Sequence, residues 1–406
     1  MVNRRLSLTF RPKIITLGVT AAIAILLFAG VSATAVPSEE WNKTYGGKGN
    51  DYIYSVLQTS DGGYIIAGET NSFEAIGTDA WLIKTDGNGS EEWNKTFGGW
   101  GTDVAHTALQ ISDGGYILAG DTSSYGAGWD DAWLIKTDAD GNEQWNRTFG
   151  GESIDSGYSV QQTTDGGYIL GGDTYSYGPS WWSDAWLIKT DLKGVEEWNR
   201  TFGGTGGERS RSVQQSSDGG YILAGSQGLD AWLLKADSNG VEEWNRTFGD
   251  SDTDNNDDAY SVQQTTDGGY ILISSYDTSW PDPMGDDMDN FTIRHGIWLI
   301  KTDSNGNEEW IKTFGCEYLF DYEFNIPEGV MVIEETSTIQ QTTDGGYVFT
   351  ALKPIGSLGE GHYDAVLVKI EGEEGATGTS TPGFEIFTAI SSAAIIAVIL
   401  ILRRRV

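Results

Sequence analysis

The sequence predicts an all-β fold built from six similar four-stranded units, and three observations support this prediction. Each unit contains four short segments rich in β-branched and aromatic residues, and turn residues separate these segments. The units repeat at intervals of 52, 52, 53, 49 and 77 residues. Four short strands in a repeat of this length are typical of a β-propeller blade. The repeats are marked by the tetrapeptide Asp-Gly-Gly-Tyr, which starts at Asp61, Asp113, Asp165, Asp218, Asp267 and Asp344.

The first complete repeat shows how each strand is expected to form. Residues 52–59 are β-rich and lead into the turn at residues 60–63, after which residues 64–67 form a second strand. Asp-Gly between two apolar segments predicts a tight hairpin in which both central residues have positive φ. Residues 79–85 form the third strand, and residues 92–97 form the fourth after another turn rich in glycine.

The third strand of each unit is apolar on both faces. Because side chains alternate along a strand, Trp81 and Ile83 lie on one face, and Ala80 and Leu82 lie on the other. A sheet with two apolar faces has to be covered on both sides. We therefore expect successive blades to pack face to face around a common axis.

The order of strands predicts how the ring closes. The repeats begin with a fourth strand at Glu40–Tyr45 and end with a third strand near Val366. The N-terminal strand would then complete the last blade, which removes two exposed sheet edges. The prediction is a six-bladed β-propeller over residues 36–370, with a β-solenoid as the alternative.

The first 35 residues resemble a secretory signal peptide. Basic residues precede a long apolar run, and Ala33-Thr34-Ala35 has the pattern of a cleavage site. An uncleaved N-terminal anchor is the alternative, because the apolar run is long. At the other end, residues 371–381 form a linker rich in Gly, Thr and Glu.

The last 25 residues, 382–406, have three parts in order. Pro382, Gly383 and Phe384 precede an apolar run to Leu402, which three arginines follow. The run would span about 28 Å as a helix, enough to cross a bilayer, and the arginines would stay inside. This tail resembles the PGF-CTERM sorting signal of archaeal surface proteins. The resemblance implies two partners, an archaeosortase-like processing enzyme and a membrane lipid.

A plain membrane-spanning helix is the alternative for this tail. In both cases we expect an exported protein at the cell surface, anchored in the cytoplasmic membrane by its C-terminus.

The formal net charge of −34 argues against a nucleic-acid partner and fits a solvated acidic surface. The single cysteine, Cys316, excludes an intramolecular disulfide.

Seven Asn-x-Ser/Thr sequences predict N-glycosylation of the exported protein. Five of them recur at one place, the predicted outer strand of a blade. The alternative is that Asn and Thr are simply the outward-facing residues of that strand. The predicted acceptors are Asn42, Asn88, Asn94, Asn146, Asn199, Asn245 and Asn290.

One face of the predicted propeller carries the candidate ligand site. The turns on one side are nearly the same in every repeat, whereas the loops on the other side are variable and rich in aromatic residues. Loops on a rigid scaffold commonly carry binding residues, and Trp and Tyr suit a carbohydrate or protein partner. Packing of these rings over the blade tops is the alternative. The candidates are Tyr125, Trp129, Tyr175, Tyr177, Trp181, Trp182 and Trp280.

An acidic segment is a candidate Ca²⁺ site. Its carboxylates alternate like the start of an EF-hand loop, but Asn255 and Ser261 stand where that loop needs Gly and Glu. The candidate ligands are Asp250, Asp252, Asp254, Asp257 and Asp258.

A second set of acids recurs at the start of each first strand. We expect these acids to accept backbone hydrogen bonds, and a ring of charge along the central channel is the alternative. They are Asp51, Asp103, Asp155, Glu208, Asp257 and Glu334.

The segment that joins third and fourth strands, Leu-Ile-Lys-Thr-Asp-x-Asn-Gly-x-Glu-x-Trp, resembles the tryptophan-docking repeat of PQQ-like propellers. That resemblance supports the fold, and no catalytic motif accompanies it. The sequence therefore predicts a binding or cell-envelope interaction protein, for a protein or carbohydrate ligand, that is not an enzyme. Two alternatives are a polysaccharide-active hydrolase or lyase and a purely structural envelope component.

Overall fold

A computed structural model confirms the all-β fold and its repeated sheets. The chain divides into two units, Met1–Glu40 and Trp41–Val406, and every described residue belongs to the second. Among the described residues, no helix is long and apolar enough to cross a membrane. The predicted terminal segments lie outside these residues, so their boundaries stay predictions. The structure describes residues 43–73, 75–179, 181–249, 257–277, 292–319, 339–341, 347–354 and 363–370.

In the described part of the chain, five sheets have four antiparallel strands each, joined in chain order, and a sixth has three. The first sheet contains β1 Asp51–Gln58, β2 Tyr64–Thr70, β3 Asp79–Thr85 and β4 Glu91–Phe97. The second contains β5 Asp103–Gln110, β6 Tyr116–Thr122, β7 Asp131–Thr137 and β8 Glu143–Phe149. The third contains β9 Asp155–Gln162, β10 Tyr168–Thr174, β11 Asp184–Thr190 and β12 Glu196–Phe202.

The remaining sheets follow the same plan. The fourth contains β13 Glu208–Gln215, β14 Tyr221–Gln227, β15 Asp230–Ala236 and β16 Glu242–Phe248. The fifth contains β17 Ala259–Gln264, β18 Tyr270–Asp277, β19 Thr292–Thr302 and β20 Glu308–Leu319. The sixth contains β21 Ile339–Gln341, β22 Tyr347–Pro354 and β23 Tyr363–Ile370.

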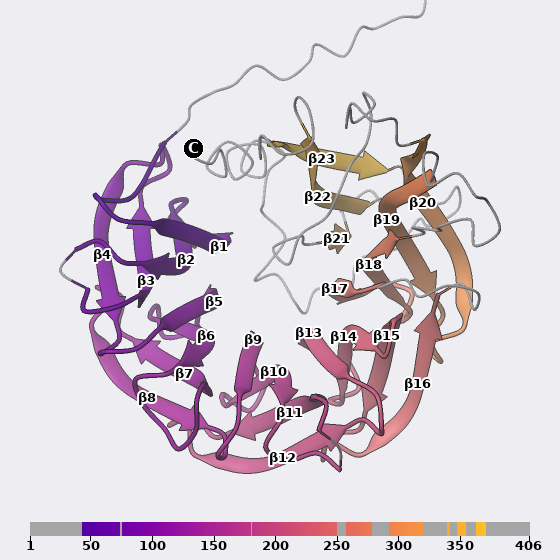
Figure 1. The fold of residues 1–406 in the computed structure, drawn as a ribbon, viewed down its shortest axis with the longest axis horizontal. Helices are drawn as coiled ribbons and strands as arrows, with labels where there is room; N and C mark the ends of the chain where they lie inside the picture. Colours follow the sequence, from indigo (N-terminus) through magenta and orange to yellow (C-terminus); the bar gives the residue numbers. More distant parts are fainter. Residues whose placement is uncertain are drawn as a thin grey trace, which may run out of the picture. The chain divides into compact units, whose positions relative to one another are not determined.

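Successive sheets pack against one another as the blades of a β-propeller do. The first strand of each sheet contacts the first strand of the next, from β1 and β5 through to β17 and β21. These first strands lie innermost in Figure 1, and the fourth strands lie outermost. We call β1, β5, β9, β13 and β17 the inner strands.

The predicted N-terminal strand differs from the structure where it can be compared. Lys43–Tyr45 is not in a strand, and residues 40–42 lie outside the described part. Tyr45 nevertheless packs on Ile66, Trp81 and Ile83 of the first sheet, and its hydroxyl donates a 2.6 Å hydrogen bond to the Gly89 carbonyl. Closure of the ring and the count of six complete blades remain predictions.

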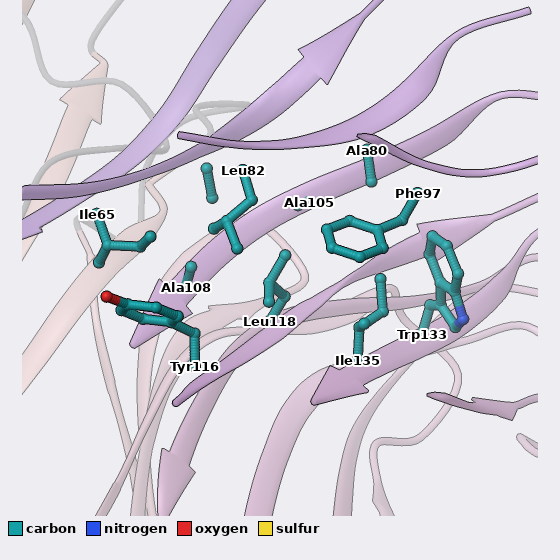
Figure 2. Close-up of a cluster of buried hydrophobic side chains, with 11 residues drawn as sticks. Ile65, Ala80, Leu82, Phe97, Ala105, Ala108, Tyr116, Leu118, Trp133 and Ile135 are labelled. Carbon is teal, nitrogen blue, oxygen red and sulfur yellow. The ribbon is translucent and has the colours of Figure 1, made fainter. Parts of the chain in front are cut away.

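Each gap between sheets is filled by the apolar third strands, as the sequence predicts. Ala80 and Leu82 face the second sheet and pack near Leu118 and Ile135, as Figure 2 shows. The other face of β3 carries Trp81 and Ile83, which belong to a separate cluster. Burial of one such Leu or Ile side chain contributes about 1.5–3 kcal/mol to stability. The third strand of a sheet therefore stabilises the packing against the sheets on both sides.

The recurrent tryptophan of each fourth strand docks on the next sheet. The Trp93 ring meets the Tyr116 ring edge-on, with 5.8 Å between centroids. A side chain at Gly141 would meet the Trp93 ring within 2.5 Å. The glycine of the turn between third and fourth strands is therefore needed for close approach as well as for its φ of 74°.

The two glycines of each Asp-Gly-Gly turn have different roles. Gly62 has a φ of 87°, whereas neither Asp61 nor Gly63 has a positive φ. The prediction that both central residues adopt positive φ is therefore wrong. A Cβ at Gly63 would lie 2.0 Å from the Thr85 carbonyl oxygen, so Gly63 is required for close contact with β3.

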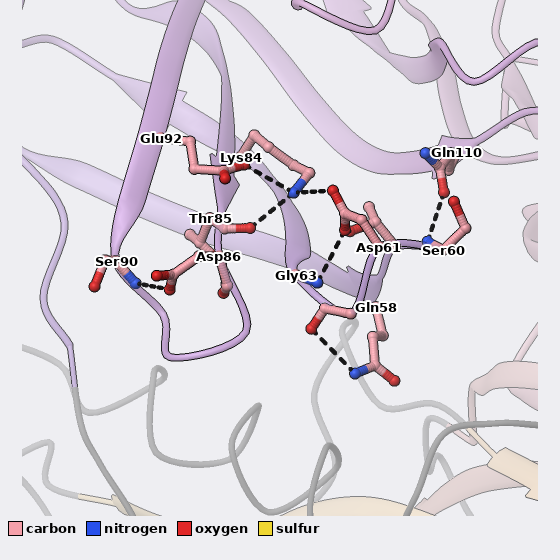
Figure 3. Close-up of polar contacts among 12 residues, drawn as sticks. Gln58, Ser60, Asp61, Gly63, Lys84, Thr85, Asp86, Ser90, Glu92 and Gln110 are labelled. Carbon is pink, nitrogen blue, oxygen red and sulfur yellow. Dashed lines mark hydrogen bonds and ion pairs between the residues drawn. The ribbon is translucent and has the colours of Figure 1, made fainter.

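A buried lysine ties each turn to its sheet. Figure 3 shows the Lys84 ammonium group 2.9 Å from Asp61 and 3.0 Å from Glu92, and it also donates to the Thr85 carbonyl. Burial raises the pKa of Asp61, but hydrogen bonds from Thr59 and Lys84 outweigh it and bring the value to about 2. The Lys–Asp pair recurs at Lys136, Lys189, Lys235 and Lys301.

We predict that Lys189→Ala destabilises the protein. Its side chain is 4% exposed and holds Asp165 and Glu197 together. The expected loss is about 2 kcal/mol, less than the roughly 3–5 kcal/mol of a fully buried pair, because both carboxylates are half exposed. Urea unfolding measures the loss. The exposed turn residue Lys193 is the control, and an equal loss in Lys193→Ala would contradict the role of the buried lysine.

Candidate functional site on the inner strands

Each inner strand contains a β-bulge at the same position. The pairing with the second strand shifts register there, so the register skips one residue of the inner strand. Bulges redirect side chains and are frequent beside active sites. The bulged residues are Tyr54, His106, Tyr158, Arg211 and Tyr260.

Four of these side chains form a continuous row across four sheets. The rings of Tyr54 and His106 lie 5.6 Å apart, and those of His106 and Tyr158 lie 5.0 Å apart. The guanidinium carbon of Arg211 lies 4.5 Å from the Tyr158 ring centroid. We call Tyr54, His106, Tyr158 and Arg211 the bulge row.

Three carboxylates accompany the bulge row on the neighbouring second strands. Glu69, Asp121 and Asp173 each lie five residues after the tyrosine of their Asp-Gly-Gly-Tyr turn. Each interacts with the bulged residue of its own sheet, as Tyr54 does with Glu69 and Tyr158 with Asp173. We call these three carboxylates the acid row.

The pair in the second sheet is a histidine held by a carboxylate. His106 Nε2 and Asp121 Oδ2 lie 2.7 Å apart, and the side chains are 17% and 19% exposed. The Gly157 amide of the third sheet donates to Asp121 Oδ1 at 2.9 Å. Asp121 therefore fixes the imidazole orientation while both groups stay accessible, an arrangement that can give or accept a proton.

The third sheet buries a carboxyl group at the same position. Burial raises the pKa of Asp173 to about 6, although Arg211 and Arg209 act to lower it. Its Oδ1 atom has no hydrogen-bond partner among the described residues. Burial also raises the pKa of Glu69, partly offset by Tyr54 and His106. Carboxyl groups with raised pKa values are typical of proton donors in active sites.

We predict that Asp173 gives stability a distinctive dependence on pH. A folded-state pKa of about 6 against an ordinary value of 3.8 favours folding while the group is protonated. This contribution falls by about 3 kcal/mol as pH rises from roughly 4 to 6. Urea unfolding across this range would show a shallower fall in Asp173→Asn. The exposed Asp140→Asn variant should keep the slope of the original protein. Equal slopes in all three proteins would contradict the burial of a titrating Asp173.

The loop aromatics predicted from the sequence fall into two groups. Tyr125 and Tyr177 pack beside the buried Trp133 and Trp186. Their hydroxyls donate to backbone carbonyls of the preceding sheet connection. Tyr175 is half-buried. Tyr125 and Tyr177 therefore take part in the packing of the blade tops.

The tryptophans of the same loops are exposed. Trp181 is 98% exposed, and Trp129 and Trp182 also present most of their surface to solvent. Trp100, in a connection between sheets, is a further exposed tryptophan that the sequence prediction did not include. Trp280 lies outside the described residues.

The candidate Ca²⁺ ligands are only partly described. Asp257 and Asp258 are buried, whereas Asp250, Asp252 and Asp254 lie outside the described residues. Within the described ranges, no group of three or more His, Cys, Asp or Glu residues is placed to hold a metal ion. The Ca²⁺ site remains a prediction from the sequence.

The acids at the start of the first strands have the structural role that the sequence favours. Asp103 accepts hydrogen bonds from Thr122, Ser124 and the Gly99 amide. Asp155 makes the equivalent contacts in the third sheet. These carboxylates join each second strand to the connection that precedes their own sheet. Glu334 lies outside the described residues.

Most of the described predicted glycosylation sites are engaged in the sheet. The Asn94 amide group donates to Glu91 at 2.6 Å and accepts a 3.4 Å hydrogen bond from Trp81 Nε1. Asn146 and Asn199 repeat both contacts, and Asn245 repeats the one to glutamate. Asn88 instead lies in an exposed turn, and Asn42 and Asn290 lie outside the described residues.

We predict that glycan occupancy differs among these asparagines. A glycan attached to an outer-strand asparagine would break the hydrogen bond from its half-buried amide group to the neighbouring glutamate, as at Asn94 and Asn146. The Asn88 side chain is instead exposed to solvent. Peptide mapping by mass spectrometry of the protein from its native host should find higher occupancy at Asn88. Occupancy confined to the outer-strand asparagines would contradict this expectation.

The bulge row has a fixed position in each repeat, but no sequence motif marks it. The bulged residues all lie three positions after the recurrent acid, and the acid row has its own fixed position. The residue types in these columns differ between repeats. Only the shared register brings Tyr54, His106 and Tyr158 into contact.

No protein-family model matches the chain, and no curated protein is similar to it in sequence. Several solved structures are similar in fold. The WD40 domain of Pan2 from Neurospora crassa matches at 10% identity and a TM-score of 0.42, over 74% of this chain and 85% of that one. A thermostable family-43 glycoside hydrolase matches at 11% identity and a TM-score of 0.37, over 84% and 98%.

These comparisons correct one prediction. The chain was expected not to be an enzyme because no catalytic motif occurs in it. Three of the similar structures are named for glycoside hydrolase or galactanase activity, so similar sheet arrangements occur among enzymes and that expectation is withdrawn. At these identities and TM-scores, the comparisons assign no activity to this chain.

Proposed function

We propose that this protein is an extracellular polysaccharide-active enzyme, a hydrolase or a lyase, whose catalytic groups lie in the bulge row and the acid row. One observation carries the proposal. Three carboxyl groups occupy equivalent positions on neighbouring sheets, one of them pairs with His106, and the pKa of another, Asp173, is raised to about 6. A carboxyl group with a raised pKa beside an accessible histidine–carboxylate pair suits acid and base roles.

Cleavage of a glycosidic bond needs such a pair. One group donates a proton to the leaving oxygen, and another acts as base or nucleophile. The accessible pair of His106 and Asp121 is the candidate base, and the raised pKa of Glu69 makes this residue a candidate acid. Asp173 is buried beside them and is a candidate for tuning their protonation.

The exposed loop tryptophans support a role in glycan contact. Trp129 and Trp181 present flat apolar surfaces of the kind that stack on sugar rings. The same observation favours a second candidate function, binding of an envelope carbohydrate or protein by the loop face. Both functions accord with the proposed export and C-terminal anchoring, which rest on the terminal sequences alone.

We expect the purified protein to release reducing ends from at least one polysaccharide in a panel of envelope glycans. Asp121→Asn should lower this rate by about 100-fold or more, because it removes the charge that supports His106. The variant keeps the Oδ1 acceptor for the Gly157 amide. The matched control is Asp140→Asn, the same chemical change in an exposed turn, and it should retain full activity.

Two outcomes would contradict the enzymatic proposal. Glycan binding without any released product would favour the second candidate, binding by the loop face. Equal rates for Asp121→Asn and the original protein would place catalysis elsewhere.

A further inference from the structure

The fourth sheet differs from its neighbours in the charge of its inner strand. β13 carries Arg209 and Arg211, whereas the other inner strands contain no arginine or lysine. Ser226 and Ser275 stand in the fourth and fifth sheets where the first three sheets carry the acid row. The bulge row and the acid row together are therefore acidic on the first three sheets and basic on the fourth.

The two arginines lie at the end of the bulge row. Tyr158 holds the Arg211 guanidinium against its ring face, at 4.5 Å, and both arginines interact electrostatically with Asp173. A guanidinium group has five N–H donors in one plane. Arg211 therefore has enough donors to pair with a ligand carboxylate while it stacks on the Tyr158 ring.

We infer that this end of the site binds the carboxylate of an acidic sugar, a uronate residue of a glycan. The inference rests on the proposed function and names its substrate class. A planar guanidinium pairs with a carboxylate through two parallel hydrogen bonds, and stacking on Tyr158 holds the plane fixed. The neighbouring His106 and Asp121 then lie beside the sugar ring whose carboxylate is bound.

The charges around the arginines are compatible with an anionic ligand. Asp121, Asp173 and Tyr158 act on this position from the second and third sheets, and the buried Asp258, just before β17, acts on Arg209. Burial raises the pKa of Asp173, so below about pH 6 it is neutral and leaves the arginines without this counter-charge. The net charge of −34 acts mainly at longer range, and salt screens it beyond about 8 Å.

The test is a nuclear magnetic resonance titration of the full-length protein. The imidazole signals of its three histidines are followed, and His106→Gln assigns the one in the bulge row. The probes are glucuronate and galacturonate, with glucose, galactose and acetate as comparisons. We expect both uronates to shift the His106 signal and the neutral sugars to leave it unchanged. Acetate should shift it only at much higher concentration, because it lacks the sugar ring.

Arg211→Gln should raise the dissociation constant for uronate about tenfold or more, since it removes a charged hydrogen-bond donor. Arg211→Lys, which keeps the charge, should recover part of the affinity. Arg147→Gln is the matched control, because Arg147 lies over Trp145 on an outer strand. The Arg147→Gln variant should bind uronate with the same affinity as the original protein.

The inference is overturned if neutral sugars and uronates shift His106 equally, if no probe shifts it, or if Arg211→Gln leaves the affinity unchanged. A response to acetate equal to that of the uronates would indicate a general carboxylate site and also overturn it. Release of reducing ends from a neutral glycan, together with any of these results, would leave the proposed enzyme standing. Absence of cleavage with specific uronate binding would instead reject the enzyme and retain the ligand class.

Discussion

The fold depends on the third strand of each sheet, which is buried on both faces. Trp81 and Ile83 cover one side of β3, and Ala80 and Leu82 cover the other. A sheet of this kind is not stable alone in water, because both of its apolar faces would be exposed. Successive sheets must therefore stack face to face, and this stacking brings their inner strands together.

The polar contacts divide into a repeated set and a divergent set. The repeated set holds each sheet in shape, as Lys84 does with Asp61 and Glu92, and it varies little between sheets. The divergent set lies on the inner strands, where β-bulges turn Tyr54, His106, Tyr158 and Arg211 toward one another. The scaffold does not need these side chains to be alike, and such divergent positions on a rigid scaffold are where binding residues are commonly found.

The sequence predicted the sheets, their strand order and their two-sided core, because hydrophobic alternation and turn residues act locally. It did not predict the bulge row, because contacts such as that between His106 and Tyr158 depend on the register of separate sheets. The turn chemistry was only partly predicted, since Gly62 has the expected positive φ but Asp61 does not, and the close approach of Gly63 to β3 was not foreseen. Trp129 and Trp181 are exposed loop residues, as expected, whereas the packing of Tyr125, in the same loop as Trp129, against Trp133 was not predicted.

A crystal structure of the protein soaked with an oligosaccharide that it binds would test the central claim, that the inner strands form the ligand site. We expect electron density for the sugar in contact with His106 and Asp121, with its carboxylate, where it has one, directed toward Arg211. Density confined to Trp129 and Trp181 on the loop face, with the bulge row unchanged and unoccupied, would contradict the claim. In that case the row would be a structural contact between sheets.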